Sequence, residues 1–249
     1  MTLDVRPLAE SLTRAWQSGT RIPADTLPLA DEAQAYAVQD GVIARLGPVG
    51  GWKVGAPDNA SEPNGAPLPT ACLRASGASL GLAAASVRGI ELEVAVRLKT
   101  DLRPGQRLLP REEVAAAIEA VMPAIELVDS RLVETRHAPA PARLADLQSH
   151  GALVLGDPSP IDPLSLDFTG LRTRLWFDGA PAADLTGGHT APDVWRLLAW
   201  LARHAQARGL PLRAGQVITT GSCTGLLVAE PGAQVVGEID GLGRVALQV

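Results

Sequence analysis

Apolar residues recur at helical spacing in three parts of the chain. Two of these patterns lie near the N-terminus and predict helices over residues 5–18 and 30–46. The third follows Ala191, where apolar residues recur three and four positions apart, and it ends at Gly209. We therefore expect an early helical region and one long amphipathic helix late in the chain.

The spacing of apolar residues changes in the middle of the chain. Residues 86–99 alternate apolar and polar side chains and predict the clearest strand. Residues 109–123 predict a helix that begins near Pro110, carries acidic residues in its first turn and stops at Pro123. The segment AIELVDSRL, residues 124–132, returns to a strand pattern.

Shorter elements fill the remaining segments. Residues 58–71 are rich in Pro, Asn, Gly and Ser and predict a mobile loop, after a short β-prone run at VGGWKVGAP. Residues 141–156 predict a short helix and then a strand, and residues 173–188 a hairpin that turns at Asp178-Gly179. Several short strands follow residue 215, so helices early and strands late indicate an α+β fold.

Composition narrows the class of protein. The chain has 249 residues, is 46% hydrophobic and carries a net charge of -5. We expect one catalytic domain over residues 1–249 with residues 1–46 as its helical N-terminal region. The acidic balance argues against nucleic acid, and the absence of a long apolar run argues against membrane insertion, so a cytoplasmic location is expected.

Three glutamates stand in apolar strand contexts. Glu91 and Glu93 point to the same face of the strand IELEVAV, and Glu126 lies in the apolar run AIELV. Three carboxylates on neighbouring strands can converge on a hard divalent cation such as Mg²⁺ or Mn²⁺. For any one of them alone, an exposed strand position or an ion pair with Arg88 or Arg97 is the simpler interpretation.

Lys53 is one of only two lysines among 22 basic residues. It lies between glycines in GWKVG, where a partly desolvated ammonium can move a proton or bind an anionic substrate, although a surface lysine has the same appearance. Asp129 and Asp146 are expected to cap helices or to support a site. The segment TTGSCTG offers backbone N–H groups to a carboxylate, and the four histidines show no ligand spacing.

Nucleotide-binding and serine-hydrolase motifs are missing from the sequence. It contains no Gly-x-Gly-x-x-Gly after a strand, no P-loop and no Gly-x-Ser-x-Gly. Cys72 and Cys223 have no metal-ligand spacing and are expected to be free thiols.

The order of several motifs resembles one enzyme family. GWKVG, GIELEVAV, PAIELVDSR, LADLQSHGALVLG, GQVITTGSCTG, PGAQV and IDGLGRVAL follow one another as in the hydratase/decarboxylase branch of the fumarylacetoacetate hydrolase superfamily, from about residue 30 to the end. Two places depart from that pattern. Leu147 stands where the family often has Asn, and the motif before the late helix reads GGHTAPD.

The resemblance implies a fold, a metal and a set of site residues. The fold is a mixed, twisted β-roll with peripheral helices, in chains that form homo-oligomers. Glu91, Glu93 and Glu126 match the ligands of Mg²⁺ or Mn²⁺, Lys53 matches an active-site lysine, and Asp146 and Ser149 are the nearest matches to residues that assist catalysis.

Several functions are compatible with that resemblance. The first is a metal-dependent hydratase that adds water to a 2-hydroxy-2,4-dienoate in aromatic catabolism. The second is decarboxylation of a 4-oxalocrotonate-like 2-oxo-dioate, and the third is hydrolysis of an acylpyruvate C–C bond. The third commonly uses a His-Glu pair ahead of the metal motif, whereas the first histidine here is His137. A scaffold without metal, its glutamates solvated, is the non-enzymatic alternative.

Overall fold

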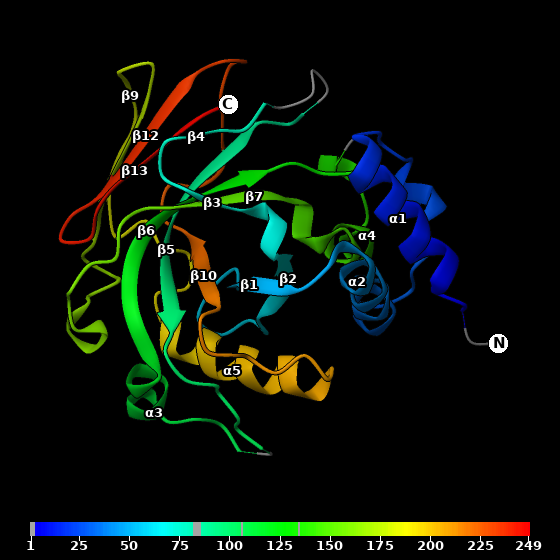
Figure 1. The fold of residues 1–249 in the computed structure, drawn as a ribbon, viewed down its shortest axis with the longest axis horizontal. Coiled ribbons are helices and arrows are strands. Elements are labelled where there is room, and N and C mark those ends of the chain that lie inside the picture. The colour runs from blue at the N-terminus through cyan, green and yellow to red at the C-terminus, as the bar shows by residue number, and fades with distance from the viewer. Residues whose placement is uncertain (1–2, 82–85, 106, 134) are drawn as a thin grey trace.

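The computed structural model describes residues 3–81, 86–105, 107–133 and 135–249. Two β-sheets form the body of the protein, with helices around them (Figure 1). The larger sheet has eight strands, in the order β2-β1-β10-β5-β6-β7-β3 with β11 paired to β5. Its strands are β1 (Val49–Gly55), β2 (Asn64–Pro69), β3 (Leu73–Ala75), β5 (Gly89–Leu98), β6 (Ile118–Val128), β7 (His150–Leu155), β10 (Val217–Ser222) and β11 (Leu227–Val228).

The smaller sheet has five strands in the order β4-β13-β12-β8-β9. They are β4 (Ala78–Ser79), β8 (Arg172–Phe177), β9 (Ala180–Thr186), β12 (Gln234–Ile239) and β13 (Gly243–Gln248). This sheet packs on β5 and β6, where a Cβ added at Gly237 would lie 2.6 Å from a methyl carbon of Leu92. The main hydrophobic core, which includes Leu92, Ile125, Val235 and Val245, fills the space between the sheets.

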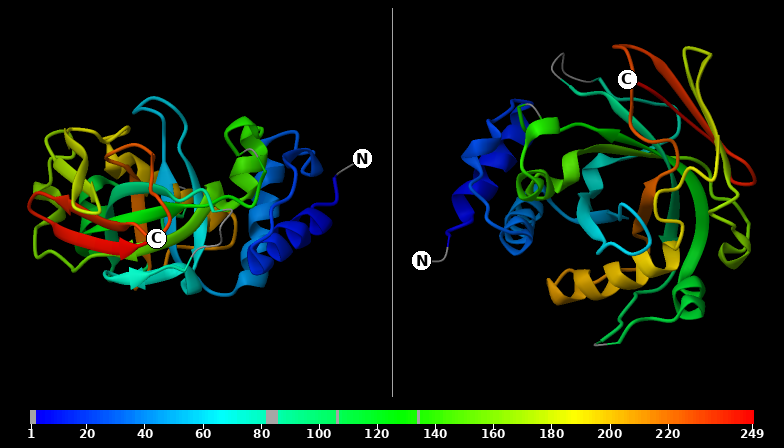
Figure 2. Two further views of the ribbon diagram at one scale, coloured as in Figure 1. Left: turned by 90° about the horizontal axis from the view of Figure 1, so that it is seen from above. Right: turned by 180° about the vertical axis from the view of Figure 1, so that it is seen from behind.

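Five α-helices occur in the described ranges, namely α1 (Arg6–Ser18), α2 (Glu32–Leu46), α3 (Arg111–Ala116), α4 (Ala140–Ala145) and α5 (Val194–Ala207). The two turned views show α1, α2 and α4 gathered at one end of the molecule, away from the smaller sheet (Figure 2). They share a second hydrophobic core that contains Leu12, Val38 and Leu147. Helix α5 packs instead against β1 and β10 through its buried leucines.

The helices predicted over residues 5–18 and 30–46 are confirmed as α1 and α2, and the late amphipathic helix is α5. Asp31 caps α2 by accepting a hydrogen bond from the Gln34 backbone N–H at 2.9 Å. The hairpin prediction is also confirmed, since Asp178 and Gly179 both have positive φ angles, 50° and 79°, between β8 and β9. The α+β fold class follows from these two mixed sheets with few helices.

Two predicted elements are wrong in their extent. The helix predicted over residues 109–123 ends at Ala116, because residues from Ile118 onward pair with β5 and bury Val121 and Met122. Pro123 therefore lies inside a strand. The loop predicted over residues 58–71 contains β2, which pairs with β1 and is almost wholly buried.

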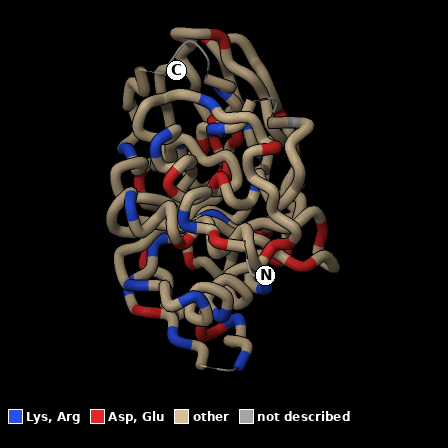
Figure 3. The backbone as a smooth tube through the Cα atoms, turned by 90° about the vertical axis from the view of Figure 1, so that its right-hand side faces the viewer, with Lys and Arg blue, Asp and Glu red and all other residues tan. Residues whose placement is uncertain are grey.

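Positively and negatively charged residues are intermingled over the molecule in the view of Figure 3. This distribution accords with the net charge of -5. Among the described residues, the helices are each too short or too polar to span a bilayer.

Candidate metal centre and adjoining cavity

The three glutamates converge because of the register between β5 and β6. Glu91 lies directly opposite Glu126 in this antiparallel pair, and Glu93 follows two residues later on the same face. One carboxylate oxygen from each residue lies within 4.8 Å of the other two. Glu93 and Glu126 are 2% and 1% exposed, and Glu91 is partly buried.

Lys53 is the cation that meets this cluster. Its Nζ lies 2.7 Å from both carboxylate oxygens of Glu126 and 3.3 Å from the Gln148 carbonyl oxygen. Strands β10 and β5 separate β1 from β6 in the larger sheet. The strong curvature of that sheet, visible in Figure 1, helps the Lys53 side chain to span the intervening strands.

The ionisation of the cluster reflects an excess of negative charge. Burial raises the pKa of Glu91 and of Glu93, and repulsion from Glu126 adds to this in both, while Lys53 opposes it. The pKa of Glu126 lies below its usual value, because attraction to Lys53 and hydrogen bonding to His150 outweigh burial. Burial lowers the pKa of Lys53, but the three carboxylates together raise it above the usual value.

These features fit a divalent cation. The donors are three carboxylate oxygens, a set that favours Mg²⁺ or Mn²⁺ over softer metals. Three clustered carboxylates face one lysine, and a divalent ion would balance the remaining charge. Burial, followed by repulsion from the neighbouring carboxylates, raises the pKa of Glu91 and of Glu93, and a divalent ion would stabilise their charged forms.

The segment TTGSCTG, residues 219–225, contacts two of these carboxylates. Strand β10 has an irregularity between Thr219 and Ser222, where Gly221 takes a φ angle of 109°. This turn directs the Gly221 backbone N–H to the Glu93 carboxylate at 3.0 Å. Ser222 forms a side-chain hydrogen bond with Glu91. The carboxylates that this segment binds in the structure are therefore the protein's own.

His150 is the residue of this site that the sequence did not identify. Its Nδ1 lies 2.8 Å from Glu126 Oε1, its side chain is fully buried, and its Nε2 has no hydrogen-bond partner among the described residues. Burial lowers the pKa of His150 although Glu126 opposes this, so the ring is neutral. A neutral ring that donates from Nδ1 fixes one oxygen of Glu126. The feature of the sequence that could have identified His150 is its position directly after Ser149, at the start of a predicted strand.

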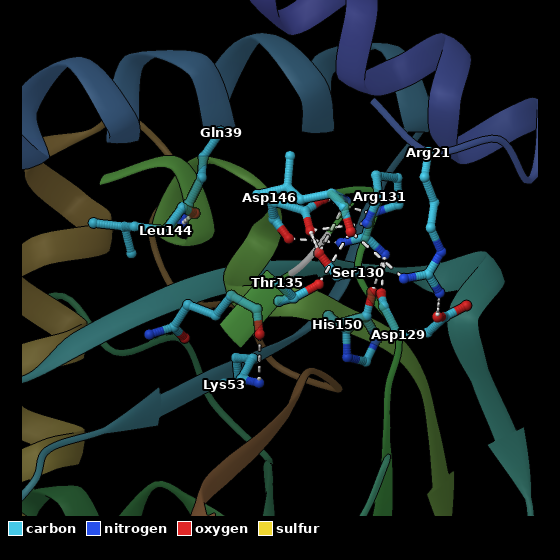
Figure 4. Close-up of polar contacts among 12 residues, drawn as sticks. Arg21, Gln39, Lys53, Asp129, Ser130, Arg131, Thr135, Leu144, Asp146 and His150 are labelled. Carbon is cyan, nitrogen blue, oxygen red and sulfur yellow. Dashed lines mark hydrogen bonds and ion pairs between the residues drawn. The ribbon is translucent and has the colours of Figure 1, made fainter. Parts of the chain in front are cut away.

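A strained turn lies between α4 and β7, beside Lys53. Leu147, Gln148 and Ser149 have positive φ angles of 48°, 52° and 58°. Asp146 anchors this turn by accepting hydrogen bonds from Ser130 Oγ at 2.7 Å and Arg131 Nε at 2.5 Å. Figure 4 shows the guanidinium of Arg131 within this network.

Two connected cavities open beside the cluster. The inner one has a volume of about 250 Å³ and is lined by residues that include Glu93, Gly221 and Ser222. The outer one has a volume of about 480 Å³ and includes Ser149 and Arg143 in its wall. Both are lined by Lys53, Asn64, Glu91 and Gln148, so these residues lie where the two cavities meet.

The structure places the other expected residues in different positions. Lys53 and Ser149 line the outer cavity, but Asp146 is 2% exposed and lines neither cavity. The helix-cap interpretation of the two aspartates is wrong, since Asp146 bonds Ser130 and Arg131 while Asp129 bonds Arg21 and Ser86. Leu147 packs in the helical core and does not face the cavity. Both cysteines are free, as expected.

A model of the fumarylacetoacetate (FAA) hydrolase C-terminal family matches residues 42–249. The chain belongs to this family. Family membership agrees with the mixed β-sheets, and the glutamate cluster lies within the matched region. It also confirms the resemblance drawn from the order of the motifs.

Two relatives illustrate the family. A 2-hydroxyhexa-2,4-dienoate hydratase of Comamonas testosteroni is 35% identical over 175 residues, which cover 69% of this chain and 64% of that protein. A 2-keto-4-pentenoate hydratase of Paraburkholderia xenovorans (strain LB400) is 30% identical over 250 residues, covering 95% of this chain and 91% of that protein. The match to the first thus spans less than two thirds of its length.

A solved structure resembles the whole chain. It is a 4-oxalocrotonate decarboxylase from Pseudomonas putida G7 complexed with magnesium and adipate. The two structures superpose with a TM-score of 0.83 at 26% sequence identity, and the match covers 99% of this chain and 98% of the decarboxylase.

Proposed function

We propose that this enzyme adds water to a 2-hydroxy-2,4-dienoate and forms a 4-hydroxy-2-oxo acid. The observation that carries the proposal is the convergence of three carboxylates, two buried and one partly buried, with Lys53 beside two cavities. Hydratases at 30% and 35% identity support the reaction class. The substrate is a small 2-oxo or 2-hydroxy acid, and the homo-oligomer and the cytoplasmic location expected from the sequence remain predictions.

Glu91, Glu93 and Glu126 would hold the metal ion, Mg²⁺ or Mn²⁺. When bound, such an ion supplies Lewis-acid stabilisation of negative charge on the oxygens of a 2-oxo acid. The neighbouring decarboxylase structure, which contains magnesium, supports this assignment.

The residues of the cavity would orient the substrate and exclude bulk water. Lys53 Nζ is placed to donate a hydrogen bond to a substrate oxygen, while the Gln148 carbonyl oxygen and Glu126 fix its direction. Ser149 offers a hydroxyl in the cavity wall. Asp146 acts at a distance from the substrate, because it anchors the turn that presents Gln148 and Ser149.

The hydration consumes one molecule of water and needs no oxidant or reductant. A proton moves from the C2 hydroxyl to the terminal carbon C5, which converts the dienol into a conjugated 2-oxo-3-enoate. The oxygen of water then bonds to C4 and a proton is added at C3. Lys53 is the group closest to the carboxylate cluster that can move a proton during these steps.

Decarboxylation of a 4-oxalocrotonate-like 2-oxo-dioate is the second candidate. The similarity to a decarboxylase over nearly the whole of both chains favours it. In that reaction the bond to the distal carboxylate breaks and CO₂ leaves, the electron pair moves to the C2 oxygen, and a proton added to that oxygen gives the dienol. The reaction requires the same stabilisation of negative charge at the 2-oxo group.

The two candidates are separated by incubating the purified protein with Mg²⁺ or Mn²⁺ and each substrate. For the 2-hydroxy-2,4-dienoate, we expect loss of ultraviolet absorbance and formation of the 4-hydroxy-2-oxo acid, both abolished by a chelator. Release of CO₂ from 4-oxalocrotonate without hydration of the dienoate would replace the first candidate by the second. Absence of both reactions in the metal-loaded protein would contradict the proposed function.

A further inference from the structure

The outer cavity has one cationic side chain besides Lys53 in its described wall. Arg143, in the last turn of α4, lines this cavity but not the inner one. The inner cavity contains Glu93 and Gly221 but not Arg143, so Arg143 lies in the part of the outer cavity that the two cavities do not share. A substrate anchored at the glutamate cluster and extending outward would therefore approach Arg143.

Arg143 is held in place without being neutralised. Its Nη1 donates a hydrogen bond to the Ala138 carbonyl oxygen at 2.5 Å, and its side chain is half-buried. In the described part of the chain, the carboxylates that form ion pairs do so with other residues. Its remaining N–H groups are available to a ligand, and a guanidinium fixed at one nitrogen loses less entropy when it binds a carboxylate.

The wall of the outer cavity, which contains Lys53 and Arg143, also suits a short hydrocarbon chain. Val128, Ala140, Leu144 and Leu226 contribute apolar surface to the same cavity. A volume of about 480 Å³ lies within the range of small-molecule sites. The carboxylate and lysine where the cavities meet, together with an apolar wall and an arginine in the unshared part, match an acid that carries a second negative group.

We propose that Arg143 binds a second carboxylate at the far end of the substrate. The preferred substrate is then a 2-hydroxy-2,4-diene-dioate, whose first carboxylate and C2 oxygen face the glutamate cluster. This inference rests on the proposed function for the orientation of the substrate. It concerns binding, so it can be tested without any turnover.

Two unreactive six-carbon acids isolate the effect of the second carboxylate. Adipate carries a carboxylate at both ends, and hexanoate carries one only. Titration calorimetry with the Mg²⁺-loaded protein should show adipate binding about tenfold more tightly than hexanoate, the gain expected from one charge-assisted contact. Arg143→Leu should remove this difference, and Arg143→Lys should retain part of it.

Arg74→Leu is the matched control, since the Arg74 guanidinium also bonds backbone carbonyl oxygens and does not line the cavity. It should keep the preference for adipate. Equal affinity of the wild-type protein for the two acids would overturn the role of Arg143, as would an unchanged preference in Arg143→Leu. A protein that prefers adipate but hydrates neither a 2-hydroxy-2,4-dienoate nor the corresponding diene-dioate would support the carboxylate subsite and contradict the proposed hydration.

Discussion

Lys53 occupies a position that an arginine would fill poorly. Its Nζ contacts both oxygens of Glu126 and the Gln148 carbonyl oxygen, and its side chain is 15% exposed. An ammonium group makes these contacts from a single atom, whereas a planar guanidinium would spread its donors over a wider area. The retention of lysine in a chain with 20 arginines has a physical reason here.

Replacement of Lys53 by alanine should lower turnover about 100-fold or more, because the group that orients the substrate and moves a proton is removed. Mn²⁺ binding, measured by calorimetry, should persist or tighten, since the ammonium no longer competes for Glu126. Lys99→Ala, at the other and exposed lysine, should behave as the wild-type protein. Full activity of Lys53→Ala would refute the catalytic role of Lys53.

His150 allows a separate test of how Glu126 is oriented. His150→Leu removes the hydrogen bond to Glu126 and should weaken Mn²⁺ binding about tenfold, whereas His150→Asn can retain a donor near the Nδ1 position. Nitrogen NMR of the wild-type protein should show the Nδ1–H tautomer. Unchanged Mn²⁺ affinity in a folded His150→Leu variant would show that Glu126 is oriented by Lys53 alone.

The segment between β9 and α5 packs closely on the turn that follows β10. A Cβ at Gly188 would lie 2.2 Å from the Cys223 carbonyl oxygen, and Gly187 has a φ angle of 69°. The Cys223 backbone N–H bonds the Leu92 carbonyl oxygen, so this contact reaches the strand that carries two of the glutamates. The motif GGHTAPD, which departs from the family pattern, thus begins at a place where only glycine fits.

Gly188→Ala should lower the free energy of unfolding by about 1–3 kcal/mol, because the clash is with backbone and not with a flexible side chain. Urea denaturation measures this change. Gly55→Ala is a suitable control, since a Cβ there has no heavy atom within 4 Å. Equal stability of the two variants would mean that the segment can shift away from Cys223.

Several elements could be predicted from local sequence, and others depend on pairing. Helix α2 has its own cap at Asp31, and the β8–β9 hairpin has its own turn at Asp178-Gly179, so neither needed tertiary information. Residues 117–123 have helical composition but pair with β5, a partner that local patterns do not reveal. The helix prediction failed there for this reason.

The same distinction applies to the candidate site. Alternation in IELEVAV placed Glu91 and Glu93 on one face, and the apolar context of Glu126 suggested a third ligand. The contact of His150 with Glu126 depends on the pairing of β7 with β6, and the position of Arg143 depends on α4. The roles assigned to Lys53, Ser149 and the three glutamates remain predictions.

At the scale of the whole molecule, a buried histidine, His189, and a half-buried one, His204, link stability to pH. Burial lowers the pKa of His189 to about 4. The pKa of His204 is also lowered to about 4, mainly by burial and to a smaller extent by repulsion from Arg208. Neutral His189 accepts a hydrogen bond at Nδ1 from the Ala191 backbone N–H, an acceptor that protonation would remove. Both residues lie outside the carboxylate cluster.

The free energy of unfolding should fall as the pH drops from about 6.5 to about 4. Above 6.5 both histidines are neutral in the folded and unfolded states, whereas below it the unfolded chain binds protons that the folded protein resists. Between pH 7.5 and pH 5, His189 should account for about 2 kcal/mol of the loss. Urea denaturation at pH 7.5 and pH 5 should show a smaller difference for His189→Asn than for the wild-type protein.

The glutamates lie on paired strands, whereas part of the cavity wall lies outside them. Natural selection can therefore act on substrate preference separately from the proposed metal site. Hydrogen-bonded neighbours fix the ligands on β5 and β6, whereas Leu144, Arg143 and Leu226 of the outer wall belong to a short helix and a turn. Substitutions in that wall should change which acid is accepted while the proposed metal ligands keep their positions. New substrate ranges are therefore accessible from this scaffold by few steps, without loss of its chemistry along the way.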